Sequence, residues 1–281
     1  MKNPLVRIKE LRSCMGESER MIADFLLDEP NVVLEYNIRA LAAKLYVSPA
    51  TIVRFCKHLG FSGYRELRQA LIYELAMYAK SDSRENLDIA KDDSIENIAK
   101  KIVNKNILSL QETEKLLDME MISKCVDLID NASNILLFGV GASQSVAKDA
   151  YLKFLRLNKP CSTIEDWHAQ LLMAKNSSRK DVAIMISYSG ETREMIECMR
   201  ALKENRTPTI VITRFAPSTI SSMASYVLYV SAGESMFRSG AISSRIAQLN
   251  IIDILYTAYA SRNYDVSLLY LQKTHIGKTN I

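Results

Sequence analysis

The fold of the second half of the chain is decided by residues 182–192, which read VAIMISYSGET. Five apolar residues are followed at once by three hydroxyl side chains and a glycine, which is typical of a buried strand ending in a polar loop before a helix. Residues 135–143, ILLFGVGAS, repeat this arrangement. Two such stretches in one chain favour a parallel sheet with helices between its strands.

The same alternation continues to residue 260. Further apolar runs predict strands at 209–213 and 226–230, and amphipathic stretches predict helices at 143–157, 191–205 and 239–260. Because short apolar runs alternate with helical stretches, this half of the chain is predicted to be α/β, with a parallel sheet covered on both faces.

The N-terminal 78 residues are predicted to be entirely helical. Apolar residues recur at helical spacing before Pro30, over 38–45, after Pro49 and over 64–78. The polar stretch that follows lacks the apolar surface needed to join a core. We therefore expect a helical domain at 1–78, a linker at 79–94 and an α/β domain at 95–281.

Residues 42–55, AAKLYVSPATIVRF, have the order of a helix-turn-helix. Ser48 is a natural N-cap and Pro49 suits the first helical position, so the second helix begins at a defined place. Its apolar stripe consists of Ile52, Phe55 and Leu59. Tyr46 occupies a turn position where many such motifs use glycine, so some backbone strain is expected there.

Basic residues gather around this motif. Between Arg39 and Arg68 six bases stand against one acid, a formal charge of +5 in a chain of net charge +4. A local basic patch is typical of a nucleic-acid contact, and the second helix of such a unit enters the major groove. We expect contacts with double-stranded DNA from Lys44, Ser48, Ala50, Thr51, Arg54 and Lys57. The alternatives are a solvated helical face, or a helical hairpin that packs on something other than DNA.

Hydroxyl side chains follow two of the predicted strands, where ligands of open parallel sheets bind. Backbone N–H groups and the helix dipole favour an anion there without Lys or Arg, so a sugar phosphate is a reasonable ligand. The candidate ligand-binding residues are Ser143, Ser187, Ser189 and Thr192. Alternatively, some of these hydroxyls merely cap helices. A dinucleotide fingerprint fails because position 144 is Gln, and hydrolase-elbow and Walker A patterns are absent.

The chain resembles the RpiR family of bacterial transcription regulators, in which a helix-turn-helix domain precedes a SIS (sugar isomerase) domain. The resemblance rests on VSPATIVRF at 47–55, LGFSGY at 59–64 and the two loops at 139–143 and 187–192. It implies a five-stranded parallel SIS sheet flanked by helices, and phosphate binding by Ser187, Ser189 and Thr192 with Ser143 beside them. It also implies a homodimer or homotetramer assembled through the SIS domains, which presents paired DNA-reading heads to operator DNA.

SIS domains also occur in aldose–ketose isomerases, so catalysis is an alternative. That chemistry needs a general base and a group that opens the sugar ring. Glu234 is the best available base and His168 the best ring-opener, although we interpret Glu234 as a contact to a ligand hydroxyl. Arg238 and Arg245 could contact ligand or a partner subunit. The alternative functions are thus a phosphosugar isomerase or lyase with an accessory helical domain, and a SIS module whose helical domain contacts protein.

Composition narrows the class of protein further. No apolar run approaches the ~20 residues of a membrane helix, and no apolar segment typical of a secretory signal follows the N-terminus. The five cysteines are widely spaced without a C-x-x-C pair, which argues against disulfides and zinc. We therefore expect a cytoplasmic, phosphosugar-responsive transcription regulator that is not an enzyme and needs no cofactor or metal.

Overall fold

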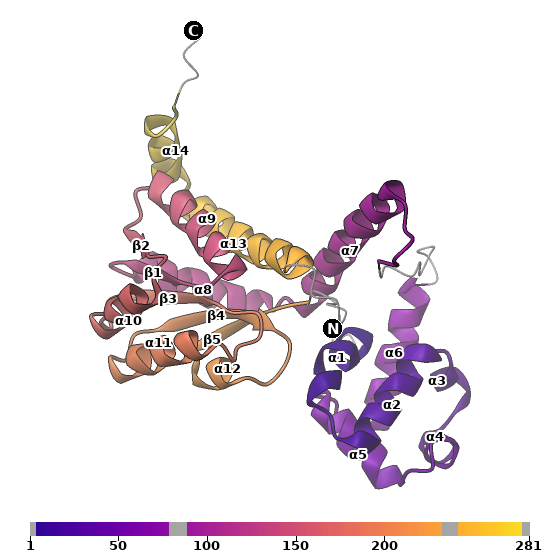
Figure 1. Ribbon diagram of the computed structural model, residues 1–281. Helices are drawn as coiled ribbons and strands as arrows, with labels where there is room; N and C mark the ends of the chain where they lie inside the picture. Colours follow the sequence, from indigo (N-terminus) through magenta and orange to yellow (C-terminus); the bar gives the residue numbers. More distant parts are fainter. Residues whose placement is uncertain (1–3, 79–88, 232–240, 277–281) are drawn as a thin grey trace. The chain divides into compact units, whose positions relative to one another are not determined.

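The computed structural model describes residues 4–78, 89–231 and 241–276, which form two compact units (Figure 1). The first unit comprises residues 1–116 with 215–217, and the second comprises 117–214 with 218–281. Glu234 and Arg238 lie outside the described residues. None of the helices in the described ranges combines the length and apolar character of a membrane span.

The first unit is helical. Its α-helices are α1 (Pro4–Leu11), α2 (Glu17–Asp28), α3 (Val32–Glu35), α4 (Ile38–Lys44), α5 (Pro49–His58), α6 (Tyr64–Tyr78) and α7 (Ile95–Leu116), with a 3-10 turn at Arg12–Cys14 after α1. Apolar side chains from all the helices between α1 and α6 form one cluster. Its fully buried members include Ile22, Leu41, Ile52, Phe55 and Leu67.

Helix α7 groups with the first unit, whereas the sequence analysis placed residues 95–116 in the second domain. The polar face of its C-terminal half is buried, with Thr113 fully enclosed. Lys9 of α1 forms a salt bridge with Glu112, with 3.2 Å between Nζ and Oε1. Because these contacts of α7 with the first unit are made by polar side chains, no apolar stripe in the sequence predicts that α7 belongs to that unit.

The second unit alternates helices with strands. Its elements are α8 (Met119–Asn131), β1 (Ile135–Phe138), α9 (Ala142–Arg156), β2 (Cys161–Thr163), α10 (Trp167–Lys175), β3 (Val182–Ile186), α11 (Arg193–Glu204), β4 (Thr209–Arg214), α12 (Thr219–Met223), β5 (Tyr226–Val230), α13 (Ile242–Arg262) and α14 (Tyr264–Lys273). The five-stranded all-parallel sheet confirms the predicted fold class, and the four strands predicted from apolar runs are present.

The sheet has the order β2-β1-β3-β4-β5 and is covered on both faces. Alternate strand residues face opposite layers, so that Leu137 and Ile184 pack with α8, α9 and α13 on one face. Phe138 and Met185 pack with α10, α11 and α12 on the other. Figure 1 shows these two helical layers on either side of the strands.

The strand order reverses between β1 and β3. The chain leaves β1 toward β2 on one side of the sheet and continues from β3 toward β4 and β5 on the other. Phe138 pairs with Met185, so the loops that follow β1 and β3 begin side by side. In open α/β sheets this switch point is where ligands bind.

Candidate functional site

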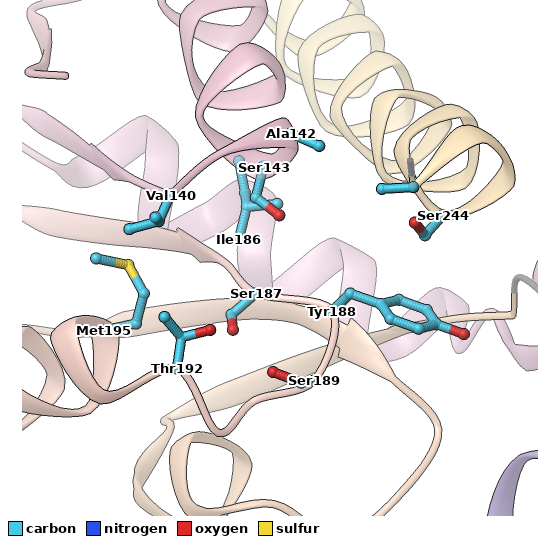
Figure 2. A pocket seen from close by; sticks show the side chains of 11 residues that line it. Val140, Ala142, Ser143, Ile186, Ser187, Tyr188, Ser189, Thr192, Met195 and Ser244 are labelled. Carbon is cyan, nitrogen blue, oxygen red and sulfur yellow. The ribbon is translucent and has the colours of Figure 1, made fainter. Parts of the chain in front are cut away.

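A pocket of about 460 Å³ opens at the switch point between β1 and β3. It is lined by hydroxyl side chains from three segments, together with the apolar side chains of Val140, Ile186 and Met195 and the ring of Tyr188. The lining hydroxyls belong to Ser143, Ser187, Ser189, Thr192 and Ser244. Figure 2 shows Ser143 and the loop after β3 around one hollow, with Ser244 reaching it from α13. Four of the five residues predicted to bind ligand are thus brought together.

Several of these hydroxyls are not used by the protein itself. The Ser187 Oγ atom is buried and has no hydrogen-bond partner in the described part of the chain. Thr192 is the N-cap of α11 but makes no side-chain capping bond, and the N-cap of α9 is Gly141 rather than Ser143. Ser189 Oγ accepts a hydrogen bond from Glu191 N at 3.2 Å, which leaves its proton to be donated. The capping alternative is therefore wrong for Thr192 and Ser143.

The loop after β3 is fastened to the neighbouring connection between β4 and α12. Glu191 accepts hydrogen bonds from the backbone N–H and the hydroxyl of Thr219, at 2.6 and 2.8 Å. Gly190 has φ +66°, and a Cβ built on it would lie 2.2 Å from Ser218 Oγ. Only glycine combines this left-handed backbone with such a close approach, so the position of Ser187–Thr192 is fixed by its neighbours.

The loop after β1 is held by a glutamine that the sequence analysis did not single out. Gln170, fully buried on α10, accepts from Gly139 N at 3.2 Å and donates to Gly139 O at 2.9 Å. A Cβ on Gly139 would lie 2.7 Å from the backbone of Ser143. The glycine therefore lets the first turn of α9 lie directly against the loop, which brings Ser143 into the pocket.

Helix N-termini supply the positive potential of the site. Helices α9, α11 and α13 begin at Ala142, Arg193 and Ile242, each at or next to a pocket-lining residue. Each N-terminus carries a partial positive charge and unpaired N–H groups. Together with neutral hydroxyl donors, this arrangement suits a phosphate group.

Other residues considered from the sequence lie elsewhere. His168 is exposed on the first turn of α10 and does not line the pocket, and Arg245 is exposed on α13. Glu234, the fifth predicted ligand-binding residue, lies outside the described residues, as does Arg238. Within the described ranges, no three His, Cys, Asp or Glu side chains form a group that could hold a metal ion.

The helix-turn-helix forms a second candidate site. Ser48 accepts a hydrogen bond from Thr51 N at 3.1 Å, and Pro49 opens α5. Tyr46 has φ +52°, which confirms the left-handed backbone expected at the turn, and its side chain is 97% exposed. The outward positions of this region are those predicted to face DNA, with Thr51 half-buried and the others exposed: Lys44, Ser48, Ala50, Thr51, Arg54 and Lys57.

A buried carboxylate supports two side chains of α5. Glu19 of α2 is only 8% exposed, and its Oε2 lies 2.9 Å from His58 Nδ1. Its Oε1 lies 3.4 Å from Arg54 Nε. Arg54 is thereby held to α2 through its Nε atom, and its side chain is otherwise largely exposed. The sequence analysis missed Glu19, because a lone acid on a neighbouring helix carries no local signal.

Comparison with known proteins identifies the family. The "Helix-turn-helix domain, rpiR family" model matches residues 2–78 and the "SIS domain" model matches residues 128–258. An HTH-type transcriptional regulator of Caldanaerobacter subterraneus subsp. tengcongensis is 38% identical over 274 residues, covering 98% of this chain and 96% of that protein. The chain belongs to the RpiR family of transcriptional regulators.

Other relatives of this RpiR-family regulator span nearly its whole length. HexR of Pseudomonas aeruginosa, an HTH-type transcriptional regulator, is 35% identical over 262 residues, covering 93% of this chain and 90% of HexR. The structure of Vibrio vulnificus NanR complexed with ManNAc-6P matches with a TM-score of 0.60 and 27% identity, covering 97% of this chain and 96% of that one. The RpiR-family protein is thus a helix-turn-helix transcriptional regulator with a SIS domain.

Proposed function

We propose that this regulator binds a sugar phosphate in the pocket between β1 and β3, and that this ligand alters its binding to operator DNA. The observation that carries the proposal is the set of five hydroxyls and three helix N-termini around one pocket. Hydroxyl and N–H donors hold a phosphate, and the remaining apolar and aromatic lining leaves room for a sugar. The similarity to NanR, which was solved with ManNAc-6P, supports this ligand class.

The DNA-binding half of the proposal rests on α5. Ala50, Thr51 and Arg54 lie in its N-terminal part and would face base edges in the major groove. Lys44 and Lys57 would lie nearer the phosphates, and Ser48 would contact the backbone beside them. A symmetric oligomer would place two such helices on half-sites about one DNA turn apart, or a multiple of it.

We further propose that the protein is a cytoplasmic homodimer or homotetramer. Large apolar side chains are exposed along α9 and α14, and Thr274 Oγ1 donates to Arg156 O at 3.2 Å where the two helices end. The exposed residues are Leu152, Leu155, Val266, Leu268 and Leu269. Several large exposed apolar side chains on two helices that meet at their ends are typical of a protein–protein interface.

Regulation would follow from a difference in affinity. The effector can shift the balance between two arrangements of the DNA-binding heads only as far as it binds one arrangement more tightly. A coupling free energy of about 1–3 kcal/mol is typical for such systems. The same coupling must then appear as a change of effector affinity when operator DNA is bound.

The alternative activity is a phosphosugar isomerase or lyase. We propose that the protein is not an enzyme, because relatives covering nearly its whole length are named transcriptional regulators. The pocket-lining side chains in the described ranges are hydroxyls, apolar groups and one phenol. Glu234 remains the candidate base if the alternative holds.

The test is a titration of labelled DNA from upstream of the protein's own gene, at two salt concentrations, with and without a panel of phosphosugars. Ser189→Ala should weaken effector affinity by about 10- to 100-fold, the loss of one charge-assisted hydrogen bond, and keep DNA binding. Arg54→Ala should weaken DNA binding by about 5- to 100-fold and keep effector binding. Ser145→Ala and Arg200→Ala, at exposed positions on α9 and α11, are the matched controls.

Salt-dependent DNA binding that one phosphosugar alters would support the proposal. No DNA binding at low salt, including to neighbouring intergenic DNA, would contradict the regulator. The panel would then be tested as substrates of an isomerase. If Ser189→Ala lost DNA binding as well as effector binding, the division between the two sites would be wrong.

A further inference from the structure

Helix α13 contributes a second polar side chain behind the pocket. Ser244 lines the pocket from its first turn, and Gln248 lies one turn further along. Gln248 is 1% exposed and its neighbours Ala247 and Ile251 belong to the apolar core. Its amide is therefore enclosed in a region where an apolar residue would be expected.

The Gln248 amide is only partly satisfied. Ser143 Oγ donates to Gln248 Oε1 over a long 3.5 Å, while Gln248 Nε2 is buried with no hydrogen-bond partner in the described part of the chain. A buried unsatisfied donor costs free energy, and its presence in a folded protein calls for an explanation. The second orphaned atom at this site is Ser187 Oγ, in the loop after β3.

The hydrogen bonds that Ser143 can donate offer an explanation. A serine hydroxyl has one proton to donate, and here that proton is directed at Gln248. A phosphate dianion only accepts hydrogen bonds, so Ser143 can bind it only if this proton is released. A glutamine amide can reverse its orientation, which presents Nε2 to Ser143 Oγ as a donor and frees the hydroxyl proton.

We infer that Gln248 is a positioning residue for effector binding, whose amide turns so that Ser143 donates its proton to the phosphate. This inference rests on the proposed phosphosugar site and assigns Gln248 no direct contact with the ligand. In the structure the amide accepts from Ser143, and when a phosphate is bound it donates to Ser143. Gln248 thus allows Ser143 to donate its proton to a group that only accepts hydrogen bonds, such as a phosphate.

The experiment is a double-mutant cycle on Ser143 and Gln248, with inorganic phosphate and ManNAc-6P as probes in NMR and calorimetric titrations of the full chain. Ser143→Ala should weaken phosphate affinity about tenfold and Gln248→Leu about three- to tenfold, whereas the double variant should bind no more weakly than Ser143→Ala alone. Gln272→Leu, at an exposed position on α14, is the matched control and should bind like the wild type.

Two further readouts separate positioning from a structural effect. Gln248→Leu removes a buried orphan donor, so its unfolding temperature without ligand should not fall, even though phosphate affinity does. Gln248→Glu is nearly isosteric, and its carboxylate only accepts when it is ionised, so at a pH high enough to ionise this buried carboxyl it should retain the Ser143 proton and weaken phosphate affinity more than Gln248→Leu. This second variant also serves if the leucine variant does not fold.

The inference is overturned if Gln248→Leu binds phosphate like the wild type, or if it weakens binding equally with and without the Ser143 hydroxyl. Wild-type protein that binds neither phosphate nor any phosphosugar would overturn the proposed function itself. Normal wild-type binding with unaffected Gln248 variants would overturn only the role of Gln248.

Discussion

Gly190 offers the sharpest test of how the ligand loop is held. Its φ of +66° places it in the left-handed region, which costs an L-residue about 1–2 kcal/mol. A Cβ at this position would lie 2.2 Å from Ser218 Oγ and 2.6 Å from Ser218 Cβ, so Ser218 must move. Overpacking of this kind typically costs about 1–3 kcal/mol. The reduced entropy of the unfolded chain offsets less than about 1 kcal/mol, so Gly190→Ala should lower the free energy of unfolding by about 2–4 kcal/mol.

The measurement is urea denaturation followed by tryptophan fluorescence. Trp167 is the only tryptophan of the chain and lies on α10, so the signal reports on the second unit. Effector affinity should fall as well, because Ser189 and Thr192 flank the displaced residue.

A second substitution separates the clash from the backbone strain. Ser218→Gly removes both crowding atoms, and glycine in place of a serine N-cap costs only a few tenths of a kcal/mol. In that background Gly190→Ala should cost only the backbone part, about 1 kcal/mol. If Gly190→Ala has the same cost in both backgrounds, the steric reasoning is wrong.

Three further outcomes are expected. Glu19→Gln should lower the ratio of specific to non-specific DNA affinity. Arg54 loses its ion pair with Glu19, which weakens specific binding, and the removal of a negative charge near the DNA-binding helix strengthens non-specific binding. Fluorescence anisotropy with operator and random DNA measures both affinities. Iodoacetamide at pH 8 should modify Cys14 alone in the native protein, as read by mass spectrometry, because burial raises the pKa of the other thiols: Cys56 and Cys125 to about 12, and Cys161 and Cys198 to about 11. Leu269→Glu, at a side chain 66% exposed on α14, should shift the proposed oligomer toward monomer in light scattering; an unchanged mass would exclude this face as the interface.

The features predicted correctly from the sequence are those specified locally. Ser48 and Pro49 fix the start of α5 wherever the helix packs, and the apolar run at 182–186 marks a central strand because both of its faces are buried. The edge strand β2 has only three residues, all half-buried, so the apolar pattern did not predict it. The fifth strand was expected only from the resemblance to the RpiR family.

The side chains that the sequence analysis missed act over long separations in the chain. Gln170 holds Gly139 from 31 residues away, and Gln248 meets Ser143 from 105 residues away. Each lies on a helix, and from the sequence alone a single buried polar residue on a helix cannot be distinguished from a polar residue on its solvent-exposed face. Their roles depend on which residue the fold places opposite them, and that information lies in the tertiary structure.

The chemistry of the pocket suits a site that binds and releases its ligand better than it suits a site that is always occupied. A sensor must be stable both empty and filled, and a buried lysine or arginine would be left without its counter-charge whenever the effector departs. Hydroxyls and helix N-termini carry no net charge, so the empty pocket bears a much smaller desolvation cost. None of the described lining residues of the pocket is charged. An amide such as that of Gln248, which can accept in one state and donate in the other, completes a site whose protein groups change hydrogen-bond direction between the two states and carry no net charge in either.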